Sequence, residues 1–152
     1  MLNPEVNHHE IRDELAKQLS DEIRLPDELV KTEHPIKMPY SSQSVRADVA
    51  IYSTPIVDFE GIAFEIKTHS DKSIRQEVLR QLHLYELGGY FPVLVADQED
   101  YKDKSGSAPS LEWIVRHLGA SYVEIVESDP LIFNLSDDRL PSGVGFPRIL
   151  DN

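Results

Sequence analysis

A continuous apolar run at residues 90–96, Tyr-Phe-Pro-Val-Leu-Val-Ala, constrains the fold more than any other segment. A strand without polar alternation is typical of a strand that is covered on both faces. The segment before it, residues 71–87, has the spacing of an amphipathic helix. Ser70 or Asp71 can cap this helix, and Gly88-Gly89 terminates it. The chain must therefore supply a layer on each side of the strand at 90–96.

Hydrophobic spacing predicts the other elements. Apolar residues at a four-residue step predict a helix over residues 8–24, begun by Asn7 and Glu10 in the manner of a capping box. Residues 98–109 are expected to form a loop. Strands are predicted at residues 29–36, 45–53, 61–68 and 122–126, and a short helix from Ser110 to Leu118. This order, with an αβββαβ core, indicates an α/β fold with a central mixed sheet flanked by helices.

The length and composition limit the class of protein. The 152 residues are expected to form one domain over residues 1–126, with an irregular C-terminal tail at 127–152 that packs on it or extends from it. The absence of cysteine excludes disulfides and thiolate metal sites. The net charge of −12 argues against a high-affinity DNA-binding module, but it allows a nuclease, in which some of the acids bind metal. No apolar run approaches the length of a membrane span, so we expect a cytoplasmic protein without a membrane partner.

Charged residues interrupt two of the predicted strands. Because side chains alternate between the faces of a strand, Glu65 and Lys67 should lie opposite the apolar face of the strand at 61–68. Asp48 should likewise lie opposite the apolar face of the preceding strand, which would consist of Val45, Ala47, Val49 and Ile51. Neighbouring strands would then bring two carboxylates and an ammonium together. Such a set can hold a hard divalent cation and a water beside it, which is the chemistry of phosphodiester hydrolysis.

Three motifs in this order resemble the PD-(D/E)xK nuclease superfamily, and more narrowly its RecB-like exonuclease branch. They are Arg46-Ala47-Asp48, Glu65-Ile66-Lys67 and the pair Gln81 and Tyr85 on the following helix. The resemblance covers residues 5–97 and departs from the superfamily at Ala47, where the proline of its name would stand. It implies a restriction-endonuclease-like fold and metal-dependent hydrolysis of DNA.

The two strand motifs supply the expected metal site. Asp48 and Glu65 would bind Mg²⁺ or Mn²⁺, together with the backbone carbonyl of Ile66, because hard ions favour oxygen ligands. Lys67 would position or deprotonate the attacking water and neutralise developing charge.

Two helices are expected to complete the site. Gln81 and Tyr85 lie at i and i+4, on one helical face, and would contact the substrate phosphate or orient Lys67. In the RecB-like branch the N-terminal helix often carries a histidine ligand, and the resemblance places His8 at that position. Glu10 and Glu14 are alternative ligands on the same helix.

Two other groups of residues lead to expectations outside the metal site. Lys72, Arg75 and Arg80 form a basic cluster on the long helix, which would either contact DNA or be an exposed helix face. We expect Trp113 and Tyr122 to belong to the core.

Two other functions stay open. A catalytically idle nuclease-fold domain that binds a protein partner, or a second copy of itself, would suit the net charge of −12. An acidic mimic of DNA is the other, but it needs carboxylates concentrated on one face, and this chain spreads them through every segment.

Overall fold

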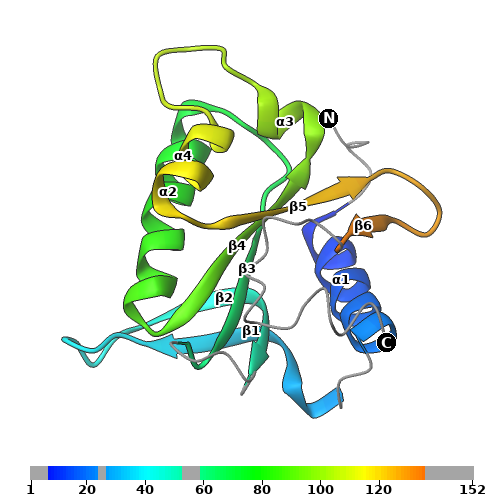
Figure 1. The fold of residues 1–152 in the computed structure, drawn as a ribbon, viewed down its shortest axis with the longest axis vertical. Helices are drawn as coiled ribbons and strands as arrows, with labels where there is room; N and C mark the ends of the chain where they lie inside the picture. Colours follow the sequence, from blue (N-terminus) through cyan, green and yellow to red (C-terminus); the bar gives the residue numbers. More distant parts are fainter. Residues whose placement is uncertain (1–6, 24–26, 53–58, 136–152) are drawn as a thin grey trace.

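The structure is a computed structural model that describes residues 7–23, 27–52 and 59–135. These residues form a six-stranded mixed sheet packed against four α-helices, with the strands in sequential order (Figure 1). The strands are β1 (Val30–Lys37), β2 (Ser44–Tyr52), β3 (Gly61–Ile66), β4 (Tyr90–Asp97), β5 (Ser121–Val126) and β6 (Ile132–Asn134). The helices are α1 (His8–Ile23), the 3₁₀ turn η1 (Asp27–Leu29), α2 (Lys72–Leu87), α3 (Gln98–Lys102) and α4 (Leu111–Leu118). The predicted α/β class and mixed sheet are confirmed.

The type of strand pairing changes twice across the sheet, from antiparallel to parallel and back. β1, β2 and β3 are antiparallel, β3, β4 and β5 are parallel, and β6 is antiparallel to β5. The helix α2 connects the parallel neighbours β3 and β4. The carboxyl ends of β3, β4 and β5 therefore lie side by side at the same end of the sheet.

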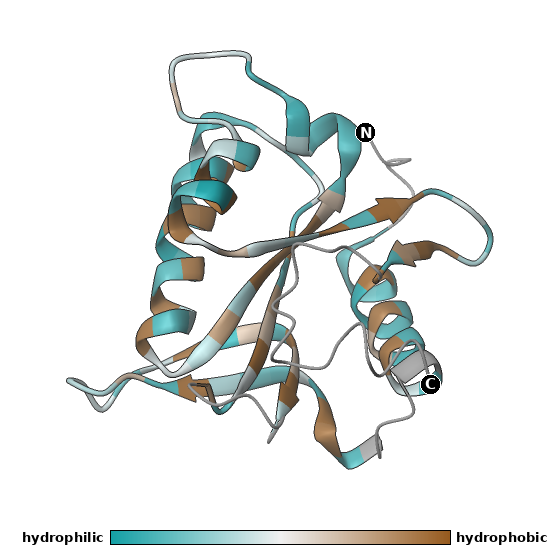
Figure 2. Ribbon diagram, viewed as in Figure 1, coloured by the Kyte–Doolittle hydropathy of each residue, from teal (hydrophilic) through white to brown (hydrophobic). Residues whose placement is uncertain are grey.

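Two hydrophobic clusters cover opposite faces of the sheet. Ile11, Leu15 and Leu19 of α1 pack on one face, and Val78, Leu82 and Tyr85 of α2 on the other. Figure 2 shows hydrophobic residues on the inner sides of these helices and along the central strands. Every residue of β3 and β4 is buried, which confirms that the run at 90–96 is covered on both faces.

The N-terminal helix begins as predicted. The side chain of Asn7 accepts a hydrogen bond from the backbone N–H of Glu10 at 2.8 Å and donates one to the Glu10 carboxylate at 2.9 Å. This pair satisfies a backbone donor that the first helical turn leaves open. None of the helices in the described ranges has the length and hydrophobicity needed to cross a bilayer.

Two short elements differ from the sequence prediction. Residues 98–102, expected in a loop, form α3 because Asp97 caps it by accepting the N–H of Asp100 at 2.7 Å. Residues 132–134, expected in an irregular tail, form β6, whose Phe133 is buried against α1 and β5. Residues 136–152 lie outside the described part of the chain.

The arginine in the first turn of α2 is a structural residue. Arg75, which we expected in an exposed basic cluster, is only 2% exposed. Its guanidinium donates to Ser70 Oγ and to three carbonyl oxygens of the loop after α3, those of Asp103, Ser105 and Ala108, at 2.6–3.2 Å. The cluster prediction is therefore wrong for Arg75, which fastens this loop to α2.

We expect Arg75→Ala to lower the free energy of unfolding by about 3 kcal/mol, because it leaves several carbonyl oxygens without their charged donor. Urea denaturation followed by circular dichroism measures this change. Arg80→Ala is the matched control on the same helix, since Arg80 is exposed, and should change the stability by no more than about 0.5 kcal/mol. Equal stability of the two variants would contradict the fastening role.

Candidate active site at the carboxyl end of β3

Asp48 interrupts the backbone pairing of β2 on both sides. The register with β1 omits the pair Glu33–Asp48, and Glu33 has a positive φ of 50°. Pairing with β3 begins only at Val49 and Phe64. In place of a ladder contact, the Asp48 carboxylate accepts the backbone N–H of Ile66 at 2.7 Å. Asp48 therefore lies where β2 and β3 separate.

This interruption also changes the faces of β2. Ala47 packs in the cluster under α2, whereas Val49 and Ile51 pack in the cluster under α1. The expected single apolar face of Val45, Ala47, Val49 and Ile51 is therefore wrong. Strict alternation fails because the strand is irregular at Asp48, between the two groups.

Glu65 is buried beneath α2. Its exposed fraction is 4%, so it does not lie on an open polar face. The Tyr85 hydroxyl donates to Glu65 Oε1 and lies 3.2 Å from the carbonyl oxygen of Arg46, while Lys67 Nζ lies 3.1 Å from Glu65 Oε2. Burial, and then the charge of Asp48, raise the pKa of Glu65 to about 7, although Lys67 and Tyr85 oppose this shift. The ionised form of Glu65 is therefore costly in this structure.

Lys67 follows directly after β3 and connects it to α2. Its backbone N–H donates to Val95 of β4 at 2.9 Å, and its Nζ contacts both Glu65 and Glu77, the latter at 2.9 Å. Burial alone would lower the pKa of Lys67, but the two carboxylates outweigh it and raise that pKa. The ammonium form is stabilised, which favours an electrostatic role over that of a general base. Glu77 was not a sequence candidate, because nothing in its helical position indicates a contact with Lys67.

The N-terminal helix places His8 beside this cluster. His8 Nε2 lies 3.4 Å from Asp48 Oδ2, and the hydrogen bond to Asp48 raises the pKa of His8 despite partial burial. The alternative ligands are occupied elsewhere on the helix: Glu10 bonds with Asn7, and Glu14 accepts a hydrogen bond from Gln18. Of the three candidates, the structure brings His8 to Asp48.

Gln81 lies one turn before Tyr85 on α2 and is half-buried. Its Oε1 atom is buried and has no hydrogen-bond partner among the described residues. Buried polar atoms are nearly always paired, so an unpaired amide oxygen is a candidate contact for a bound molecule. Tyr85 differs from Gln81 because its hydroxyl is committed to Glu65; burial and then the Glu65 charge raise the pKa of Tyr85, which keeps it a neutral donor.

The expected metal ligands form an incomplete set of side chains. Across residues 7–23, 27–52 and 59–135, no three His, Asp or Glu side chains converge to hold an ion. Mg²⁺ is commonly held by one or two carboxylates, with waters and substrate oxygens filling the other positions. Burial, and then the charge of Asp48, raise the pKa of Glu65, and this pair of acids fits that mode of binding because a divalent cation would neutralise both.

Comparisons of the chain with models of protein families, with curated proteins and with solved structures found no match. Any assignment of function therefore depends on the geometry of the cluster formed by Asp48, Glu65 and Lys67.

Proposed function

We propose that the protein is a metal-dependent nuclease of restriction-endonuclease-like fold that hydrolyses DNA phosphodiester bonds. The observation that carries the proposal is the buried carboxyl of Glu65, held beside Asp48 with its pKa raised to about 7. Such a pair lowers stability at neutral pH, and strongly shifted acids of this kind concentrate at functional sites. The neighbouring ammonium of Lys67 adds the third group that phosphodiester hydrolysis needs.

Asp48 and Glu65 would hold Mg²⁺ or Mn²⁺, with His8 and the carbonyl of Ile66 as the further ligands. The ion, when bound, supplies a Lewis acid and a water of lowered pKa. Tyr85 fixes the position of the Glu65 carboxylate through its hydrogen bond. Lys67, kept charged by its two carboxylates, would stabilise the negative charge that develops on the phosphoryl oxygens. Gln81 is the remaining candidate for a contact with substrate.

A second candidate function is an idle nuclease-fold domain that binds a protein. The net charge of −12 favours it, as does the incomplete set of metal-ligating side chains in the described residues. Activity separates the two candidates, since only the first has a chemical use for Asp48, Glu65 and Lys67 together.

A gel assay on linear, circular and single-stranded DNA tests the proposal. Cleavage of at least one form is expected with Mn²⁺ or Mg²⁺, and a chelator should abolish it. Circular dichroism of the same sample confirms that the protein is folded. A folded protein that cuts no form of DNA with either ion would reject the nuclease and leave the protein-binding domain.

His8→Ala should weaken Mn²⁺ binding by roughly tenfold or more, the usual loss when the immediate surroundings of a metal are altered. Isothermal titration calorimetry measures the affinity. His9→Ala is the matched control, since His9 is exposed on the same turn, and should bind Mn²⁺ like the wild type. The same affinity in the His8 variant as in the wild type would remove His8 from the ligand set.

A further inference from the structure

A hollow of about 520 Å³ lies between α4 and the loop that precedes it, away from the cluster of Asp48, Glu65 and Lys67. Its volume is within the range of small-ligand sites. Trp113, Lys104, Arg116, Glu112 and Ser110 are among the residues that line it. We call it the Trp113 hollow.

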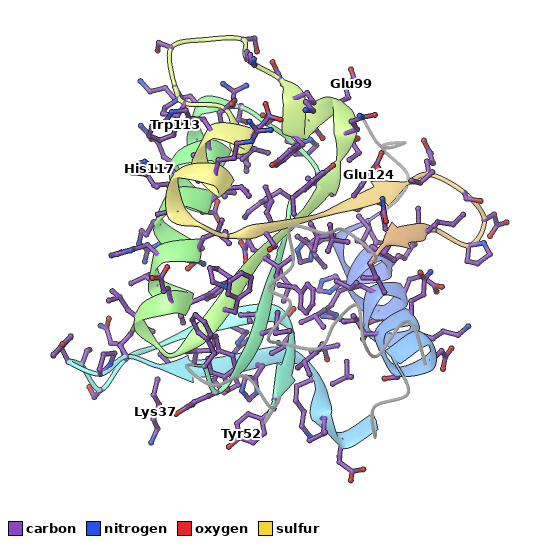
Figure 3. The ribbon with its side chains drawn as sticks, in the orientation of Figure 1. Lys37, Tyr52, Glu99, Trp113, His117 and Glu124 are labelled. Carbon is purple, nitrogen blue, oxygen red and sulfur yellow. The ribbon has the colours of Figure 1, made fainter. Side chains whose placement is uncertain are left out.

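Trp113 is exposed although it was expected in the core. The inner face of α4 consists of Leu111, Ile114 and Val115, so Trp113 lies on the outer face and is 50% exposed. The ring of His117, one turn further along, stacks on the indole with centroids 4.5 Å apart and planes 11° apart (Figure 3). His117 is not among the residues that line the hollow, whereas the half-exposed indole of Trp113 is, so the hollow gives another flat ring access to Trp113.

The charge of the hollow is positive although the protein is acidic. Lys104 and Arg116 line it, and the only acid among its lining residues is Glu112. The Glu112 carboxylate lies 2.6 Å from Lys102 Nζ and 3.6 Å from Arg116 Nη2. The positive charge of Lys102 therefore balances the negative charge of Glu112. Lys104 and Arg116 then leave an excess of positive charge beside the indole.

The Trp113 hollow lies at the same end of the sheet as the candidate active site. The loop that forms one wall of it passes over the start of α2 (Figure 1), where Arg75 holds it. This first turn of α2 lies in the chain between Lys67 and its partner Glu77. The loop wall of the hollow and the Lys67–Glu77 ion pair therefore both contact the N-terminal half of α2.

We propose that the Trp113 hollow binds a single-stranded segment of nucleic acid, with one base stacked on Trp113 and its phosphates at Lys104 and Arg116. An open aromatic face beside two cations is the arrangement by which proteins bind single strands without reading their sequence. A base within a duplex already stacks on both neighbours, so the hollow favours unpaired bases. The choice of nucleic acid over other aromatic anions rests on the proposed function, but binding here does not require cleavage.

The single tryptophan of the chain makes the test direct, because all tryptophan fluorescence comes from Trp113. Short oligothymidylate, added with chelator present so that nothing is cut, should quench this fluorescence in a saturable manner. An abasic oligonucleotide with the same number of phosphates and a blunt duplex should quench it weakly or not at all. Quenching by the abasic strand equal to that by oligothymidylate, or none by either, would overturn the proposal.

Variants separate stacking from charge in anisotropy measurements with labelled oligothymidylate. Trp113→Leu should weaken binding about 5- to 150-fold, the loss expected for one stacked base, and Trp113→Phe should restore part of it. Replacing Lys104 and Arg116 by Ala should reduce the slope of log K against log salt by about 1.4, for two single-strand phosphate contacts. Lys31→Ala, an exposed cation on β1, is the control and should change neither quantity. Wild-type affinity in Trp113→Leu would overturn the proposal.

The result of the single-strand binding test is independent of the result of the nuclease assay. Quenching by a protein that never cuts DNA would retain the Trp113 hollow and reject the nuclease. Metal-dependent cleavage by a protein whose Trp113 fluorescence does not respond to single strands would retain the nuclease and reject the Trp113 hollow as a binding site.

Discussion

Glu65→Gln should abolish metal-dependent cleavage and at the same time make the protein more stable above pH 7. The folded pKa of Glu65 is about 7, against an ordinary value of 4.5, so between these pH values the folded state binds more protons than the unfolded state. The free energy of unfolding therefore falls as the pH rises through this window. Glutamine does not titrate and avoids that loss, which corresponds to about 3 kcal/mol at most.

Urea denaturation of wild type and Glu65→Gln at pH 5 and pH 8, with chelator present, measures this difference. Other titrating groups are common to the two proteins and cancel. Glu77→Gln is the control: Glu77 also contacts Lys67, but its side chain is 44% exposed, so its replacement should leave the pH dependence unchanged. DNA cleavage by Glu65→Gln would show that Glu65 is not a required metal ligand. Loss of stability in Glu65→Gln between pH 5 and pH 8, as in the wild type, would show that Glu65 is not the acid with the raised pKa.

Lys67→Ala should reduce the cleavage rate by roughly 10²–10⁴-fold, the range of losses found for catalytic groups that stabilise charge or transfer protons. Mn²⁺ binding should persist and become tighter, because the substitution removes a cation that competes for the Glu65 carboxylate. Single-turnover cleavage and calorimetry on the same preparation separate the two effects.

Lys67→Arg is the informative companion to this variant. It keeps the positive charge and should retain more activity than Lys67→Ala if the role is electrostatic. Lys37→Ala, an exposed lysine at the end of β1, should cleave at the wild-type rate. Wild-type cleavage by Lys67→Ala would exclude Lys67 from catalysis.

The sequence predicted a helix or strand well where the pattern that indicates it lies within that element. The stripe of α1, its capping pair and the apolar run of β4 depend on residues close in the chain, and all three are confirmed. The stripe of α2 did not predict Arg75, because its partners are carbonyl oxygens about thirty positions away, in the loop after α3. Trp113 was expected in the core, whereas the spacing of Leu111, Ile114 and Val115 places it on the outer face of α4.

The candidate site was likewise predictable only as far as its residue types, and not in the contacts made between distant parts of the chain. The residue types of Asp48, Glu65 and Lys67 indicated a cluster, and the structure brings the three together with Tyr85 and His8. The pattern of alternation could not reveal that Asp48 replaces a backbone contact by accepting the Ile66 N–H. It also could not reveal that α2 covers Glu65, since burial on that face depends on how the helix packs across the sheet.

The irregular strand β1 has a consequence for self-association. As one of the two edge strands, β1 has a row of backbone groups that no other described strand pairs, and another chain can add there by strand pairing. Pro35 has no N–H to offer, Glu33 departs from extended geometry with its φ of 50°, and Lys31 and Lys37 are exposed and would face like charges in a symmetric pair. These three features oppose addition of a second β1. We therefore expect any dimer of this protein to form through a surface other than a β1–β1 pair, which leaves this edge a poor template for edge-to-edge aggregation.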